Sequence, residues 1–264
     1  MRVLIHTSAW ARWAQRLGVF VVPLGVLAVI MHRQGVLEST HFLAIMGLMV
    51  ALAVLAVLFG IIALVRLWYT GDRGWGRAIA GMVLGLLTLA PLGYALADGA
   101  RYPQVADLST DPAQPLLLQS NILAPQPGPG MRAAIAEAFP TLQTRRYDAN
   151  AEAVFAAAKA LVEGAGWTVL SSQDPLSALS SGQINALTMT LAGWRDEVVV
   201  RVAGTNQGST VNMRSASLAA LADLGQNGRR IEWFLSQLDT AVAALPRATA
   251  PASDEDDTPA VVVN

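Results

Sequence analysis

The polar residues with the most chemical potential lie between a predicted strand and the last predicted helix. They are Arg214, Ser215, Ser217, Asp223, Asn227 and Arg230. Free backbone N–H groups and a helix N-terminus favour an anion at such a junction, so these side chains could form a binding site. In the structural alternative, Asn227 or Asp223 caps the helix and Arg214 pairs with Asp223 or with backbone carbonyls. We favour the structural alternative, because arginine and carboxylate in one loop readily neutralise each other.

Other catalytic groups are scarce after residue 100. The chain contains no cysteine, which excludes thiolate nucleophiles, disulfides and cysteine-type zinc sites. All three histidines precede residue 100, so a Ser-His-Asp arrangement is excluded from the remainder. A Ser-Lys pair could use only Lys159, which we expect to be solvated in the middle of a helix.

Two pairs of carboxylates could bind a cation or act as acid and base: Asp107 with Asp111, and Asp196 with Glu197. Roles in turns and caps explain them more simply. The sequence has no phosphate-binding loop and no dinucleotide fingerprint. We therefore expect no enzyme activity, no cofactor and no metal.

Composition indicates a membrane protein. The mean hydropathy is +0.43 and only 14% of the 264 residues are charged, compared with about 25% in ordinary soluble domains. Residues 1–100 carry seven arginines against three acids, whereas residues 101–264 carry eleven basic residues against sixteen acids. The acidic second part lacks the basic surface that phosphate backbones require, so we expect no nucleic-acid partner.

Three apolar segments, 17–31, 42–65 and 78–97, predict three transmembrane helices within residues 1–100. The first is short and contains Pro23, so it could also be a signal-peptide core or an interfacial helix. We predict a span, because no cleavage site follows it and Arg33 can extend its usable length. Gly81 and Gly85 could mediate dimerisation, but packing within the chain explains them more simply.

Arginine placement predicts the orientation. Three arginines precede the first segment and three lie in the second connection, while Arg33 and Arg101 stand alone on the other side. This asymmetry predicts a cytoplasmic N-terminus and an exported C-terminal domain. Because Lys159 is the only lysine, the composition suggests a GC-rich bacterial genome. We expect a bacterial inner membrane with the domain in the periplasm.

A Pro-rich, extended lead-in is predicted for residues 101–147, followed by an α+β domain over 148–246. A helix capped by Asp148 and ending at Gly164 precedes strands at 167–171, 183–191, 197–203 and 210–216. The last two strands form a hairpin about 205–208. A final helix is capped by Asn227 and terminated by Pro246.

This order predicts a small antiparallel sheet with two helices on one face. The other face could be solvated, could carry the lead-in, or could meet a partner. The acidic tail, residues 247–264, is predicted to be disordered.

Two motifs carry a family resemblance. The stretch VNMRSASLAALADLGQNGRR, residues 211–230, and the Pro-flanked segment DLSTDP, residues 107–112, resemble the signature of the bacterial family known as domain of unknown function 1499. The resemblance covers about residues 101–245 and implies no established activity. Leu218 and Ala220 replace a basic residue and a glycine that are common in the family, which argues against anion binding.

Three functional hypotheses follow. The leading one is a non-enzymatic envelope protein whose exported domain binds a protein or another envelope component near the lipid bilayer. The second is binding of a small molecule or lipid, either between sheet and helices or at Arg214 and Arg230. The third is a hydrolase that relies on carboxylates.

Overall fold

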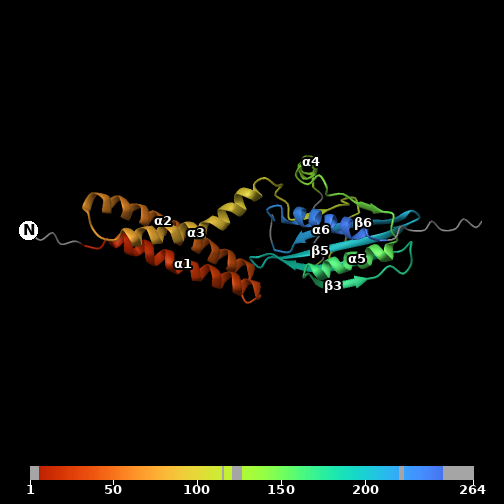
Figure 1. The fold of residues 1–264 in the computed structure, drawn as a ribbon, viewed down its shortest axis with the longest axis horizontal. Helices are drawn as coiled ribbons and strands as arrows, with labels where there is room; N and C mark the ends of the chain where they lie inside the picture. Colours follow the sequence, from red (N-terminus) through yellow and green to blue (C-terminus); the bar gives the residue numbers. More distant parts are fainter. Residues whose placement is uncertain (1–5, 115, 121–126, 220–222, 246–264) are drawn as a thin grey trace, which may run out of the picture.

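A computed structural model describes residues 6–114, 116–120, 127–219 and 223–245 of the chain. Three long N-terminal helices form one end of an elongated molecule and a domain containing a β-sheet forms the other (Figure 1). Pro246 and the predicted acidic tail lie outside the described residues.

The three N-terminal helices confirm the predicted transmembrane segments. They are α1 (Ala9–Arg33), α2 (Ser39–Thr70) and α3 (Trp75–Gly99), and each is long and apolar enough to cross a membrane. The short first segment belongs to a helix of 25 residues that continues through Pro23. Large apolar side chains such as Phe20, Leu58 and Leu87 remain exposed on the outside, as lipid contact requires.

Small residues let the three helices pack closely against one another. A Cβ placed on Gly81 would lie 2.2 Å from the backbone of Ala14 in α1, and one on Gly85 would lie 2.8 Å from the carbonyl oxygen of Ala53 in α2. Both glycines therefore serve contacts within the chain, the simpler of the two sequence-based alternatives.

The domain is built on an antiparallel sheet in the order β1-β6-β5-β4-β3, with β2 also paired to β6. The strands are β1 (Asp107–Ser109), β2 (Arg145–Tyr147), β3 (Thr168–Gln173), β4 (Ser181–Met189), β5 (Arg195–Thr205) and β6 (Gly208–Ser217). The predicted hairpin about 205–208 is confirmed by the pairing of Thr205 with Gly208.

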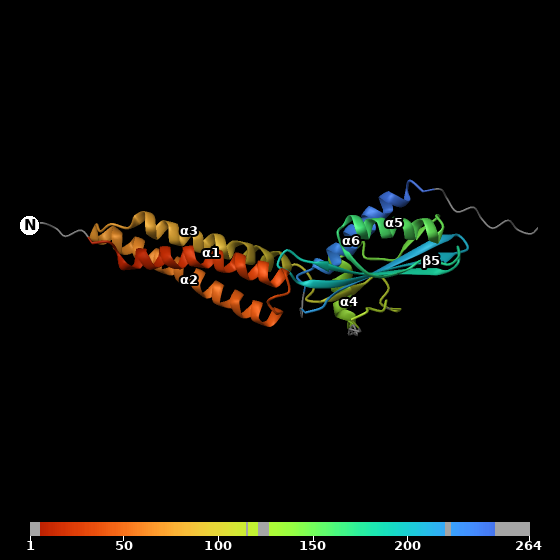
Figure 2. The same cartoon turned by 90° about the horizontal axis from the view of Figure 1, so that it is seen from below.

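Helices α5 (Ala151–Gly164) and α6 (Gln226–Val242) cover one face of the sheet (Figure 2). On this helix-covered face, alternate residues of β5 and β6 enter the hydrophobic core. The strands contribute Val198, Val200, Val202, Val211 and Met213, and the helices contribute Val154, Phe155, Ala158, Ile231, Phe234, Leu235 and Leu238. This arrangement confirms the predicted α+β class.

The opposite face is not left bare. Leu116 and Leu118 pack there against Val199 and Ala216, so we call it the loop-covered face. Helix α4 (Pro129–Ala138) also belongs to this part of the chain, but its Ile135 and Ala138 pack against the core of the helix-covered face. Of the three alternatives for this face, the structure therefore shows coverage by the lead-in.

Residues 101–147 differ from the predicted extended lead-in. They contain β1 and β2, which both pair with β6, as well as α4. These strands have three residues each, too short for an alternating pattern, and their pairing with β6 specifies them. The sheet therefore begins at Asp107, well before the predicted boundary at Asp148.

The predicted helix caps also need correction. Asn150, rather than Asp148, caps α5 by accepting a hydrogen bond from the Ala153 amide at 2.8 Å. The helix ends at Gly164 as predicted, but the residue with positive φ is Gly166. Asn227 lies inside α6, whose first amides are capped by Asp223 instead.

Candidate functional site

Strand alternation separates the six predicted site residues into two groups. Arg214 lies opposite Val199 on the loop-covered face, whereas Ser215 lies opposite Val198 on the helix-covered face. Ser217 lies two residues after Ser215 and therefore points to the same face, where its hydroxyl accepts a hydrogen bond from the Asn227 side chain of α6. The six side chains therefore do not converge on one point, because neighbouring residues on a strand point to opposite sides.

On the helix-covered face, Arg230 of α6 is the centre of a closed polar cluster. Its guanidinium lies 2.6 Å from the Asp196 carboxylate and donates to Ser215 Oγ at 2.7 Å and Asn227 Oδ1 at 2.6 Å. Ser215 also donates to Asn227, whose own amide donates to the Ala106 carbonyl. Ser215 and Asn227 are fully buried, so solvent does not reach their side chains.

On the loop-covered face, Arg214 holds the chain that crosses the sheet. It forms a bidentate ion pair with the Asp107 carboxylate, in which Nε donates at 3.0 Å and Nη2 donates at 2.6 Å. Its Nη1 also donates to the Leu116 carbonyl. The predicted pairing of Arg214 with a carbonyl is confirmed, but its carboxylate partner is Asp107 and not Asp223.

Asp223 serves the start of α6. Its carboxylate accepts hydrogen bonds from the amides of Gly225 and Asn227, which have no partner within the helix. Burial raises the pKa of Asp223 above its ordinary value, although these two amides act in the opposite direction. The capping role explains this residue without a ligand.

Glu197 is a buried carboxylate that fastens the crossing segment to the loop-covered face. It accepts hydrogen bonds from the Gln119 amide at 2.6 Å, the Ser120 amide at 3.1 Å and the Asn185 side chain at 3.2 Å. Burial alone would raise its pKa, but the bonds from Ser120, Gln119 and Asn185 together outweigh burial and lower it.

Neither predicted carboxylate pair is assembled for joint chemistry. Asp196 and Glu197 are consecutive on β5, so they point to opposite faces of the sheet. Asp107 pairs with Arg214, and Asp111 lies 3.6 Å from Arg201. In the part of the chain that the structure describes, no group of three or more His, Asp or Glu residues could hold a metal ion.

The charges at the candidate site thus compensate one another. Arg230 forms an ion pair with Asp196 on the helix-covered face, and Arg214 forms one with Asp107 on the loop-covered face. The Ser215 hydroxyl donates to an amide oxygen, which is not a base, so this geometry does not activate a nucleophile. Core side chains fill the space between sheet and helices, where a ligand was one of the sequence-based alternatives.

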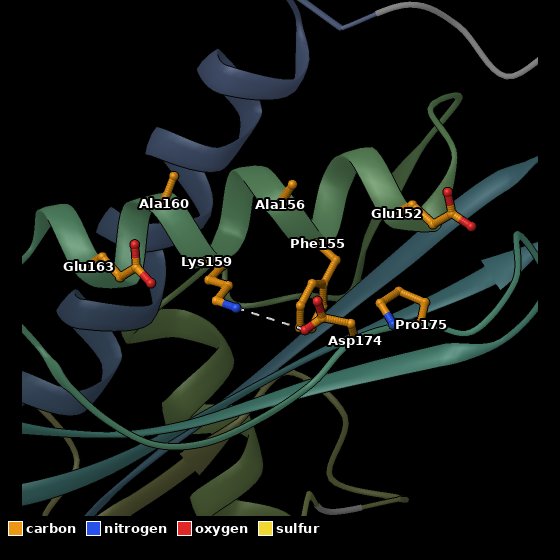
Figure 3. A pocket seen from close by; sticks show the side chains of 8 residues that line it. All are labelled: Glu152, Phe155, Ala156, Lys159, Ala160, Glu163, Asp174 and Pro175. Atoms are coloured by element: carbon orange, nitrogen blue, oxygen red, sulfur yellow. Dashed lines mark ion pairs between the residues drawn. The ribbon is translucent and has the colours of Figure 1, made fainter.

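An open groove of about 400 Å³ lies between α5 and the end of β3 (Figure 3). Ala156 and Ala160, one turn apart on α5, contribute only small side chains to its lining. Lys159 lies 3.9 Å from Asp174 across the groove, so the predicted solvated lysine is part of an exposed ion pair. The full lining is Glu152, Phe155, Ala156, Lys159, Ala160, Glu163, Asp174 and Pro175.

Sequence reasoning missed this groove, because its two sides come from elements whose approach depends on the tertiary fold. A weak signal was present in the pair of small residues Ala156 and Ala160 on an otherwise polar helix face. The exposure of the leucines just after Pro175 is visible only in the structure, where Leu176 and Leu179 are 95% and 63% exposed.

Fold and site together define a membrane protein whose three helices carry a small antiparallel α+β domain with an internally neutralised polar cluster. The model of a family described as "Protein of unknown function (DUF1499)" matches residues 107–238, half of the chain. The chain belongs to this family, and the match begins where β1 begins. No curated protein and no solved structure matches the chain.

Proposed function

We propose that this protein is a non-enzymatic interaction module of a bacterial envelope, anchored in the inner membrane with its domain in the periplasm. The observation that carries the proposal is the contrast between two surfaces. The polar cluster around Arg230 is closed and neutral, whereas the α5 groove is open and lies beside exposed leucines. Such an apolar surface with a polar rim is typical of a protein-binding site.

The groove favours a partner segment with small apolar and basic side chains. Its lining includes the apolar residues Phe155, Ala156 and Ala160, and the two small alanines admit a closely packed backbone. Its rim carries Glu152, Glu163 and Asp174 against the single Lys159, so the rim has a net negative charge. A basic segment would complement this charge and would also be steered towards the groove.

Periplasmic placement rests on the arginine distribution. Six arginines flank the connection between α2 and α3 and the start of α1, against Arg33 and Arg101 at the opposite ends of the helices. The domain follows α3 and therefore lies on the arginine-poor side of the bundle, which is the exported side in most membrane proteins.

The test is site-specific photocrosslinking in cells. A photoreactive amino acid at Leu176, beside the groove, should give a discrete adduct, while the same group at Gln207, in the exposed turn between β5 and β6, should not. Ala156→Arg should abolish the adduct by filling the groove with a cation. The matched control Ala136→Arg, at an exposed position of α4, should leave it unchanged.

Equal crosslinking from Leu176 and Gln207 would contradict the proposal, as would an adduct that survives Ala156→Arg. Turnover of a substrate by the purified full-length protein would contradict the non-enzymatic part separately.

A further inference from the structure

The turn between β4 and β5 contacts the end of the helical bundle. Arg33, the last residue of α1, donates to the carbonyl oxygens of Thr190 at 2.8 Å and Leu191 at 3.0 Å. His32 Nδ1 lies 2.7 Å from the carbonyl oxygen of Ala192, and since a carbonyl only accepts, this nitrogen carries the proton. Three consecutive carbonyls of the turn therefore have donors from the bundle.

Aromatic contacts fix the position of this turn along the axis of the helical bundle. The His32 ring stacks on Phe42 with a centroid distance of 4.1 Å, and the Trp194 ring lies 5.0 Å from His32 and 5.7 Å from Phe42. Phe42 is the first residue of the charge-free run of α2. Trp194 thus lies at the level where the apolar part of the bundle begins, which is where tryptophan is enriched in membrane proteins.

Two further side chains of the turn suit a lipid surface. Leu191 is 91% exposed, although it lies at the same level as the end of α1. The Arg195 guanidinium is exposed beside Gly35, in the connection between α1 and α2, and makes no ion pair with the described residues. In water this leucine would be an unfavourable surface residue, whereas in the interfacial layer it contacts acyl chains.

We propose that the turn 189–195 is embedded in the lipid headgroup layer. Leu191 reaches the upper acyl chains, Trp194 lies at the interface, and Arg195 binds lipid phosphates. The donors from His32 and Arg33 make this possible, because they satisfy turn carbonyls that lose water on entering the layer. The domain is thereby held against the bilayer by the turn as well as by α3, whichever side of the membrane it occupies.

Fluorescence in lipid nanodiscs tests this proposal directly. The chain contains no cysteine, so Leu191→Cys and Leu176→Cys each provide one labelling site in the full-length protein. Both leucines are over nine-tenths exposed, and Leu176 lies in the β3–β4 loop at the end of the sheet away from the bundle. A polarity-sensitive dye at position 191 should emit at shorter wavelength and lose intensity with spin-labelled lipids.

The dye at position 176 should show neither effect. Equal emission and equal quenching at the two positions would overturn the proposal. A depth profile completes the test: a spin label high on the acyl chain should quench position 191 more strongly than one near the chain end, and the reverse order would also overturn it.

The contribution of Arg195 is tested through lipid charge. Replacing part of the phosphatidylcholine by phosphatidylglycerol should raise the melting temperature of the wild-type protein, and Arg195→Gln should reduce this rise. Arg132→Gln, at an exposed position of α4, is the matched control and should keep it. Loss of the rise in both variants, or in neither, would contradict a lipid-phosphate contact at Arg195, as would an equal rise from free inorganic phosphate.

Discussion

Arg230 and Asp196 form an ion pair at 2.6 Å in which the carboxylate residue is 2% exposed. Removal of water from both charges is costly, and their mutual attraction offsets this cost only while both partners are present. The hydrogen bonds to Ser215 and Asn227 complete the coordination of the guanidinium. The polar cluster therefore connects α6 to the sheet.

This role predicts strong coupling between the two charged residues. Arg230→Met should lower the free energy of unfolding by about 3–5 kcal/mol, because it leaves Asp196 buried without its cation. The double variant Arg230→Met, Asp196→Leu should recover a substantial part of that loss. Chemical denaturation of the four proteins of the cycle measures the coupling; simple addition of the two single effects would refute the paired role.

Glu197 predicts a pH dependence of stability. Its pKa in the folded protein lies below the ordinary value of 4.5, so its contribution is fully present above that value and is lost as the pH falls through the folded-state pKa. Glu197→Gln should therefore be less stable than the wild type at neutral pH and should show a flatter acid limb. Thermal melting as a function of pH checks this, and parallel curves for the two proteins would argue against it.

The elements differ in how far the sequence could specify them. Alternating apolar residues predicted β5 and β6, and long apolar runs predicted all three bundle helices, because both patterns reflect burial along a single element. Strands β1 and β2 were not predicted, because each has only three residues and is specified by its pairing with β6. The partners Asp107 and Asp196 lie 107 and 34 residues from Arg214 and Arg230, so their pairing depends on the finished sheet.

The bundle offers a prediction about element packing. Gly81→Ala would place a Cβ 2.2 Å from the Ala14 backbone, so α1 and α3 must separate, at a cost of about 1–3 kcal/mol. Gly93→Ala in the same helix meets no atom within 4 Å among the described residues and is the matched control. Thermal melting in detergent should show a lower midpoint for the first variant only. Equal midpoints would mean that the helices do not pack as described.

Among the described residues, bundle and domain contact each other at two places. One is the contact of the β4–β5 turn with the end of α1. The other lies at the end of α3, where Arg229 of α6 pairs with Asp98 at 2.7 Å and its guanidinium lies over the Tyr102 ring, 4.7 Å from the centroid. Two separated contacts restrict rotation of the domain about the chain after α3, so the groove on α5 keeps a defined direction.

The orientation of the whole molecule in the membrane can be tested with fused reporters. Because the three helices are joined by short connections, the start of α1 and the connection between α2 and α3 lie on one side, and the domain lies on the other. A reporter that is active only after export should be active when fused after Leu245 and inactive when fused after Gly71. A reporter that is active only in the cytosol should give the opposite pattern. If the exported reporter were active after Gly71 instead, the arginine asymmetry would not set the orientation, and the periplasmic assignment would be wrong while the packing of domain on bundle would stand.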